Sequence, residues 1–174
     1  MTEEEWAMAA SVAKEYGAIV EWGCGGSSVH FVKEGIVVHS IDTDKAWIEK
    51  VTSEIASVTG ATFTTSFVDL GPVGEWGYPL KSISGKNYVQ ALPSDSTLVL
   101  IDGRYRVACA IYTRLKAPTA QVLVHDFSRE HYRPMLKYFE KVKQVHDLVL
   151  LQPRNSISYS EAMDDILLFL DDPR

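Results

Sequence analysis

Short apolar runs and amphipathic segments alternate along most of the chain. Between the runs, apolar residues recur at three- and four-residue spacing over stretches of about 10–15 residues, which predicts helices. Strands that alternate with helices favour an α/β fold, with a mostly parallel sheet covered on both faces. The apolar runs, rich in β-branched residues and predicted as strands, lie at residues 18–20, 36–41, 61–68, 97–101, 120–124 and 145–151.

Capping signals place the helices between these strands. Thr2 followed by Glu5 fits a capping box, and Gly17 can end the helix that it begins. Ser27 or Ser28 can cap a short second helix. The remaining helices are predicted at residues 44–60, 86–92, 104–116 and 132–142. The last apolar segment, residues 160–170, favours a helix with a strand as the alternative.

Length and charge narrow the class of protein. The 174 residues favour one domain, with an N-terminal helix at 1–17, a core at 18–152 and a C-terminal extension at 153–174. The net charge of −6, without a basic stripe, argues against nucleic-acid binding. Cys24 and Cys109 lie too far apart for a zinc or disulfide motif.

Membrane and export signals are not expected. The N-terminal acidic run differs from a signal peptide, and no apolar stretch approaches the length of a membrane span. The expected location is the cytoplasm.

Carboxylates recur where predicted strands end. Because parallel strands end at one edge of a sheet, these acids should lie together at the edge where α/β folds bind ligands. Acids are uncommon at half-buried positions unless they pair or bind something. The five acids, each after a successive strand, are Glu21, Asp42, Asp69, Asp102 and Asp126.

Glycines crowd the first strand-to-helix turn. Gly23, Gly25 and Gly26 would let a ligand approach the backbone closely. Asp42 follows Gly23 by 19 residues, which suits an acid that binds ribose hydroxyls. Ser28 stands where a dinucleotide fingerprint needs its third glycine. A purely structural turn is the alternative.

The segment 21–27, Glu-Trp-Gly-Cys-Gly-Gly-Ser, resembles the first motif of class I S-adenosylmethionine (SAM)-dependent methyltransferases. The resemblance implies a Rossmann-like, three-layer αβα sandwich of six or seven strands, and it extends over roughly residues 18–150. That family ends with a β-hairpin, whereas the last segment here looks helical, so a modified edge is the alternative to seven strands. The implied cofactor residues are Glu21, Gly23, Gly25, Gly26 and Ser27, with Asp42 at the ribose and Asp69 at the adenine.

Residues after the fourth strand carry the implied acceptor site. The Asp-Gly pair that begins with Asp102 resembles small-molecule O-methyltransferases, some of which bind a divalent metal through acids after strands four and five. Asp102 and Asp126 would be those acids. Phe127 follows Asp126, whereas a second acid or an asparagine is common there, and Asp126 could instead cap the next helix.

Three residues are candidates for catalysis. His125 could take a proton from a hydroxyl acceptor, Tyr105 could orient the acceptor, and Asp102, at the end of the fourth strand, is the third candidate. His131 is a weaker candidate. Each histidine could instead be a hydrogen-bonded structural partner.

Arginines and aromatic residues complete the predicted acceptor site. Arg104 and Arg106 could bind an anionic acceptor, or pair with the neighbouring acids. Trp76 and Tyr78, in the glycine-rich loop 71–79, could close over the site as a lid, or pack an irregular crossover.

The expected function is SAM-dependent methyl transfer, at oxygen, to a small molecule that could be anionic. A catalytically silent interaction module and a dinucleotide-binding oxidoreductase are the alternatives. A homo-oligomer or a partner chain could complete the pocket of so short a chain.

Overall fold

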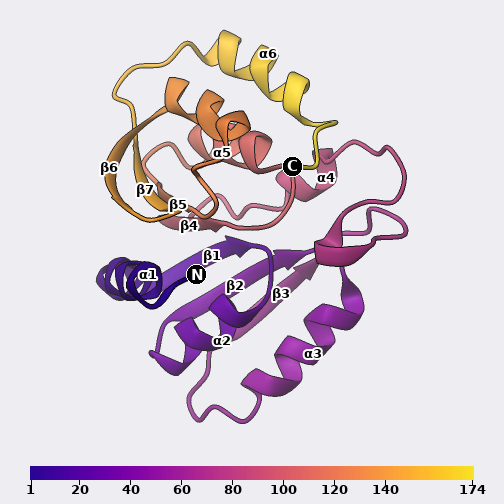
Figure 1. Cartoon of the computed structure of the whole chain (residues 1–174), viewed down its shortest axis with the longest axis vertical. Coiled ribbons are helices and arrows are strands. Elements are labelled where there is room, and N and C mark those ends of the chain that lie inside the picture. Colours follow the sequence, from indigo (N-terminus) through magenta and orange to yellow (C-terminus); the bar gives the residue numbers. More distant parts are fainter.

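The computed structural model describes all residues, 1–174, around a single seven-stranded sheet (Figure 1). The strand order is β3-β2-β1-β4-β5-β7-β6, and only β7 runs antiparallel to its neighbours. The strands are β1 (Ala18–Trp22), β2 (Val37–Asp42), β3 (Phe63–Phe67), β4 (Leu98–Ile101), β5 (Gln121–Val124), β6 (Phe139–Val145) and β7 (Leu148–Pro153). The helices are α1 (Glu3–Tyr16), α2 (Gly26–Lys33), α3 (Lys45–Ile55), α4 (Lys86–Val89), α5 (Arg106–Lys116) and α6 (Tyr159–Phe169), with 3-10 turns η1 (Glu75–Gly77) and η2 (Glu130–Lys137).

Helices cover both faces of the sheet, as the alternating pattern predicts. Helices α2 and α3 lie on one face, and α4, α5 and α6 lie on the other (Figure 1). Adjacent residues of β4 enter different cores, Leu100 beneath α1 to α3 and Ile101 beneath α4 and α5, because successive side chains of a strand point to opposite faces. The predicted three-layer αβα sandwich is thereby confirmed. No helix is both long enough and apolar enough to cross a membrane.

The caps of α1 are those that the sequence predicts. The Thr2 hydroxyl accepts from the Glu5 amide at 3.3 Å, and the Glu5 carboxylate accepts from the Thr2 amide at 2.6 Å. Gly17 ends the helix in the left-handed conformation.

The predicted serine cap of α2 is wrong. Gly25 occupies the N-cap position, and Ser27 and Ser28 lie inside the first turn. Both serine hydroxyls donate to the carboxylate of Glu21, which is fully buried. A buried carboxylate needs hydrogen-bond donors, and the two serines supply them. The Ser28 hydroxyl also accepts from the Gly25 amide at 2.9 Å.

The helix predicted at residues 132–142 is also wrong. Pro134 lacks an amide hydrogen, and the segment around it forms the 3-10 turns of η2. Residues Phe139–Val145 form the edge strand β6, in which Val142 is exposed and Lys141 and Lys143 protect the open edge.

The expected modification of the sheet edge is not found. β6 and β7 form an antiparallel hairpin, so the sheet has seven strands and α6 follows it. The helical interpretation of the last segment is confirmed, although Ser158 caps α6 and not Ser160.

Candidate functional site

The parallel strands bring the predicted acids to one edge of the sheet. Glu21 is the next-to-last residue of β1, Asp42 ends β2, and Asp102 and Asp126 follow the ends of β4 and β5. Asp69 lies two residues beyond β3, is exposed, and accepts from the Gly71 amide at 2.7 Å. The strand order reverses between β1 and β4, which is where doubly wound sheets open a ligand crevice.

Glu21 anchors the glycine loop from below. Its carboxylate accepts hydrogen bonds from the hydroxyls of Ser27, Ser28 and Ser40, the last of these on β2. Burial raises the pKa of Glu21 to about 7, against the lowering effect of the three hydroxyl donors. Sequence reasoning missed Ser40, whose small polar side chain in a buried strand was the available signal.

Gly23 brings the loop after β1 against the loop after β4. Its φ is +101°, and a Cβ built there would lie 2.9 Å from the Gly103 amide nitrogen. Gly103 is equally constrained, because a Cβ on it would lie 2.2 Å from the Tyr88 hydroxyl oxygen. The predicted cofactor loop and the predicted acceptor loop therefore touch through their backbones.

Asp42 holds the same loop from the side of β2. One carboxylate oxygen accepts from the Cys24 amide at 2.7 Å, and the other accepts from the amides of Thr43 at 2.6 Å and Asp44 at 2.9 Å. Burial raises the pKa of Asp42, against the effect of these amides. A carboxylate has about four acceptor positions, so Asp42 can still accept from a hydroxyl.

Trp47 of α3 is 40% exposed beside the glycine loop. Its indole nitrogen donates to the Cys24 carbonyl at 2.7 Å. Cys24 itself is a buried free thiol, and burial raises its pKa to about 12, so it is not a reactive nucleophile.

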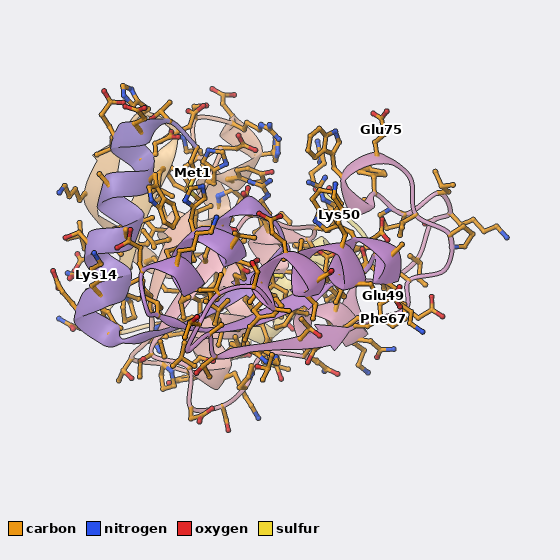
Figure 2. All side chains as sticks on the ribbon, turned by 90° about the horizontal axis from the view of Figure 1, so that it is seen from below. Met1, Lys14, Glu49, Lys50, Phe67 and Glu75 are labelled. Carbon is orange, nitrogen blue, oxygen red and sulfur yellow. The ribbon has the colours of Figure 1, made fainter.

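The loop 71–79 lies beside the end of β2. The Thr43 hydroxyl donates to the Gly77 carbonyl at 3.3 Å, which attaches the loop next to Asp42. Figure 2 shows this loop, marked by Glu75, projecting beyond the body of the molecule. Trp76 is 86% exposed, whereas the Tyr78 ring lies 5.9 Å from the Arg104 guanidinium. Only Tyr78 of the two predicted lid residues therefore reaches the acceptor loop.

Arg104 and Tyr105 face different surroundings. Arg104 has no ion-pair partner, and its buried Nε has no hydrogen-bond partner. Burial and the charge of Arg106 lower its pKa. Tyr105 is 1% exposed and its hydroxyl donates to the Ile83 carbonyl at 2.9 Å. Arg104 is thus the unpaired cation of this loop, and the Tyr105 hydroxyl is already engaged.

Arg106 is buried, which differs from its expected contact with an acceptor. Its residue exposure is 2%, and its guanidinium lies 3.2 Å from the carboxylates of both Asp102 and Asp126. It also donates to the carbonyls of Asp102, Gly103 and His125. Arg106 therefore pairs with the neighbouring acids, which was the alternative to binding an anionic acceptor.

His125 lies among three acids, Asp102, Asp126 and Glu5. Its Nδ1 is 3.2 Å from Asp102, and its Nε2 is 3.5 Å from Glu5 of α1. The hydrogen bond to Asp102 raises the pKa of His125, and burial opposes the rise. Burial opposes ionisation of Asp102 as well, yet His125 and Arg106 hold its pKa below the usual value.

Sequence reasoning missed Glu5, which it used only as a cap. Glu5 is 3% exposed, and its carboxylate also accepts from the Asp147 amide in the β6–β7 turn at 2.8 Å. Nothing in the local sequence indicates that contact, because it spans 142 positions.

Strained backbone gathers at this edge. Tyr105 after β4 and Asp126 after β5 have positive φ values of 52° and 61°, and Trp76 in the loop has 60°. Left-handed backbone is costly for residues other than glycine and clusters at functional sites. Its distribution supports the strand ends as the functional edge.

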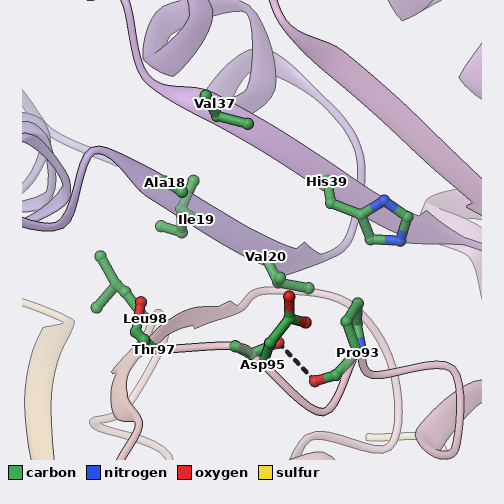
Figure 3. A pocket seen from close by; sticks show the side chains of 10 residues that line it. Ala18, Ile19, Val20, Val37, His39, Pro93, Asp95, Thr97 and Leu98 are labelled. Atoms are coloured by element: carbon green, nitrogen blue, oxygen red, sulfur yellow. Dashed lines mark hydrogen bonds between the residues drawn. The ribbon is translucent and has the colours of Figure 1, made fainter.

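A hollow of about 310 Å³ lies at the opposite edge (Figure 3). It is bounded by Ala18 at the start of β1, Val37 at the start of β2, and Pro93 and Thr97 ahead of β4. Because these are amino-terminal strand ends, the hollow is separate from the predicted site.

Comparisons with known proteins agree with this geometry. No family model and no curated protein matches the chain. Among solved structures, a methyltransferase-like protein from Silicibacter pomeroyi has a TM-score of 0.85 at 24% identity, covering 99% of this chain and 97% of its own. Magnesium protoporphyrin IX methyltransferase from Synechocystis, with bound S-adenosylhomocysteine (SAH), has a TM-score of 0.59 at 12% identity, covering 87% and 82%.

An O-methyltransferase from Bacillus cereus, in complex with SAH, has a TM-score of 0.58 at 9% identity, covering 88% of this chain and 82% of its own. One conclusion follows from the seven-stranded order with one antiparallel strand, from the glycine loop after β1 and from these structural similarities. The chain has the fold of the class I SAM-dependent methyltransferases.

Proposed function

We propose that this protein transfers a methyl group from SAM to a small anionic molecule, at an oxygen atom. The observation that carries the proposal is the meeting of Gly23 and Gly103 at the switch point between β1 and β4. There the loop that would hold the cofactor touches the loop that would hold the acceptor. Alignment of the two reactants is the main requirement of a direct displacement.

The proposed cofactor site lies along the ends of β1 to β3. Asp42 would accept hydrogen bonds from the ribose hydroxyls, and Asp69 would contact the adenine. Gly23, Gly25 and Gly26 would pass beneath the cofactor, with Glu21 and Ser27 supporting the turn. The solved structures with bound SAM or SAH support this choice of cofactor. SAM supplies an activated methyl group on a sulfonium.

The proposed acceptor site lies at Arg104 and Tyr78. Arg104 offers a buried Nε without a partner, and the Tyr78 ring covers its guanidinium. The ring nitrogen Nε2 of His131 is also buried without a hydrogen-bond partner. The unpaired Arg104 Nε–H favours an anionic group, since a charge-assisted hydrogen bond would satisfy it. Trp76, which is 86% exposed on the same loop, would cover an aromatic or apolar part of the acceptor only after the loop closes.

Proton transfer is assigned to His125. Asp102 contacts its Nδ1. This leaves Nε2 to take a proton from a hydroxyl acceptor once the Glu5 carboxylate has moved away from Nε2. A carboxylate acceptor would need no base, because its oxygen is already ionised. Tyr105 would form the wall of the site, because its hydroxyl is bound to Ile83.

The cofactor class is tested by calorimetric titration of the protein with SAH, with NADH as the control ligand. We expect micromolar binding of SAH and no binding of NADH. Binding of NADH alone would favour the oxidoreductase hypothesis, and binding of neither would favour an interaction module.

Arg104→Gln tests the anionic acceptor. With an acid acceptor found by screening for SAH release, we expect KM to rise about 10-fold or more, since a hydrogen bond to a charged group contributes roughly 1.5–3 kcal/mol. The neutral amide of the same acceptor should be used poorly by both proteins. Arg133→Gln, the same change at an exposed arginine of η2, is the control. An unchanged KM for Arg104→Gln would contradict the assignment.

A further inference from the structure

The Arg106 guanidinium occupies a cage of oxygen atoms at the ends of β4 and β5. Two oxygens are carboxylate oxygens of Asp102 and Asp126, each 3.2 Å from a guanidinium nitrogen. Three more are backbone carbonyl oxygens of Asp102, Gly103 and His125, at 3.1, 3.0 and 2.6 Å from their donors. All five therefore surround one positive charge.

This cage has the composition of a divalent cation site. Carboxylate and carbonyl oxygens are the ligands of hard divalent ions, and histidine nitrogen also suits Mn²⁺. Ligand atoms of Asp102, His125 and Asp126 all lie within 4.8 Å of one another. These three side chains alone could bind a divalent ion. The Arg106 guanidinium, which already lies between the two carboxylates, opposes that binding.

Arg106 is a permanent part of the cage. Arginine does not lose its proton in proteins, so its charge stays. The side chain is only 3% exposed and lies over the Tyr132 ring at 5.3 Å, which restricts any movement away from the acids. An incoming divalent ion would meet a fixed positive charge next to both of its carboxylate ligands.

The charges of the cluster balance without a metal. Asp126 contacts Arg129 at 3.0 Å in addition to Arg106, and Asp102 contacts His125 at 3.2 Å. Asp102 is thus shared by two nitrogen-bearing side chains and Asp126 by three, because His125 Nδ1 also lies 3.7 Å from Asp126. Half-buried acids arranged in this way need no further counter-ion.

We propose that Arg106 takes the place of a divalent cation between Asp102 and Asp126, so that the acceptor edge works without metal. The residues at this edge do not fit a metal ion, contrary to one expectation from the sequence. Arg106 is then a positioning residue that fixes Asp102, and through it His125, by an internal charge. The inference that methyl transfer needs no metal rests on the proposed function. The inference that Arg106 occupies the metal position does not.

Titration with Mn²⁺ alone, followed by calorimetry and electron paramagnetic resonance, tests the proposal without any turnover. We expect the wild-type protein to bind Mn²⁺ no better than an exposed acidic surface does. Arg106→Ala should bind Mn²⁺ about 10-fold more tightly or better, because it removes a unit charge that lies 3.2 Å from both carboxylates. Adding Asp102→Asn to that variant should abolish the gain.

Arg114→Ala is the matched control. Arg114 is a second buried arginine of α5, 5% exposed, but it donates to the Arg154 carbonyl and has no acidic partner. This variant should gain no affinity for Mn²⁺. If Arg106→Ala does not fold, as judged by circular dichroism, Arg106→Gln replaces it, because glutamine keeps hydrogen-bond donors but lacks the charge.

Two results would overturn the proposal. One is Mn²⁺ binding by the wild-type protein that is lost on Asp102→Asn, and this measurement needs no Arg106 variant. The other is a folded Arg106 variant that binds Mn²⁺ no better than wild type. Either result leaves the SAH titration unaffected, so failure of this proposal and failure of the proposed function are distinguishable.

Discussion

Asp42→Ala should weaken SAH binding about 10- to 100-fold, since hydrogen bonds to charged groups contribute roughly 1.5–3 kcal/mol and each 1.4 kcal/mol is a factor of ten. Two losses add together in this variant. The proposed ribose contact disappears, and the Cys24 amide loses the oxygen that holds the glycine loop at 2.7 Å. Calorimetric titration with SAH measures the effect.

Asp44→Ala is the matched control for Asp42→Ala. It removes the same charge two residues away, but its carboxylate accepts from the Trp47 amide as the cap of α3. We expect a stability loss of about 1 kcal/mol from the lost cap and an SAH affinity within about threefold of wild type. Unchanged affinity in a folded Asp42→Ala protein would refute the ribose assignment.

Gly23→Ala should lower the free energy of unfolding by about 2–4 kcal/mol, which is the upper range for single substitutions with a named structural cause. Left-handed backbone strain is one cause, because φ is +101°. The other is the new Cβ, which would lie 2.9 Å from the Gly103 amide nitrogen and 3.0 Å from the Asp102 carbonyl carbon. Backbone atoms cannot move aside as a flexible side chain can.

Gly35→Ala separates these two causes. Its φ is +77°, yet a Cβ there meets nothing within 4 Å. Only the strain of about 1–2 kcal/mol should remain. Thermal unfolding followed by circular dichroism should give a melting temperature for Gly23→Ala below that of Gly35→Ala. Equal melting temperatures would show that the close approach of the loops after β1 and β4 does not contribute to stability.

The sequence predicted the framework of the fold because each signal is local. Apolar runs and amphipathic periods are properties of single elements, and they predicted six of the seven strands. The remaining strand, β6, was misread as a helix, because Phe139 and Val142 also fit a helical period. Its pairing with β7, which decides the conformation, lies outside the segment itself.

The sequence also predicted which residues gather at the functional edge. Glu21, Asp42, Asp102 and Asp126 lie at or just after the ends of β1, β2, β4 and β5, and parallel pairing of these strands brings such positions together. The glycine turn is equally local, since its spacing to Asp42 can be read directly from the chain.

Only the tertiary structure decided what each side chain does at that edge. Arg106 and Arg104 are two residues apart, yet one is enclosed by five oxygens and the other has no ionic partner. Glu5 reaches His125 across 120 positions of sequence. The physical reason is that secondary structure follows from neighbours along the chain. Burial and charge pairing depend on neighbours in space, which exist only after the strands have assembled.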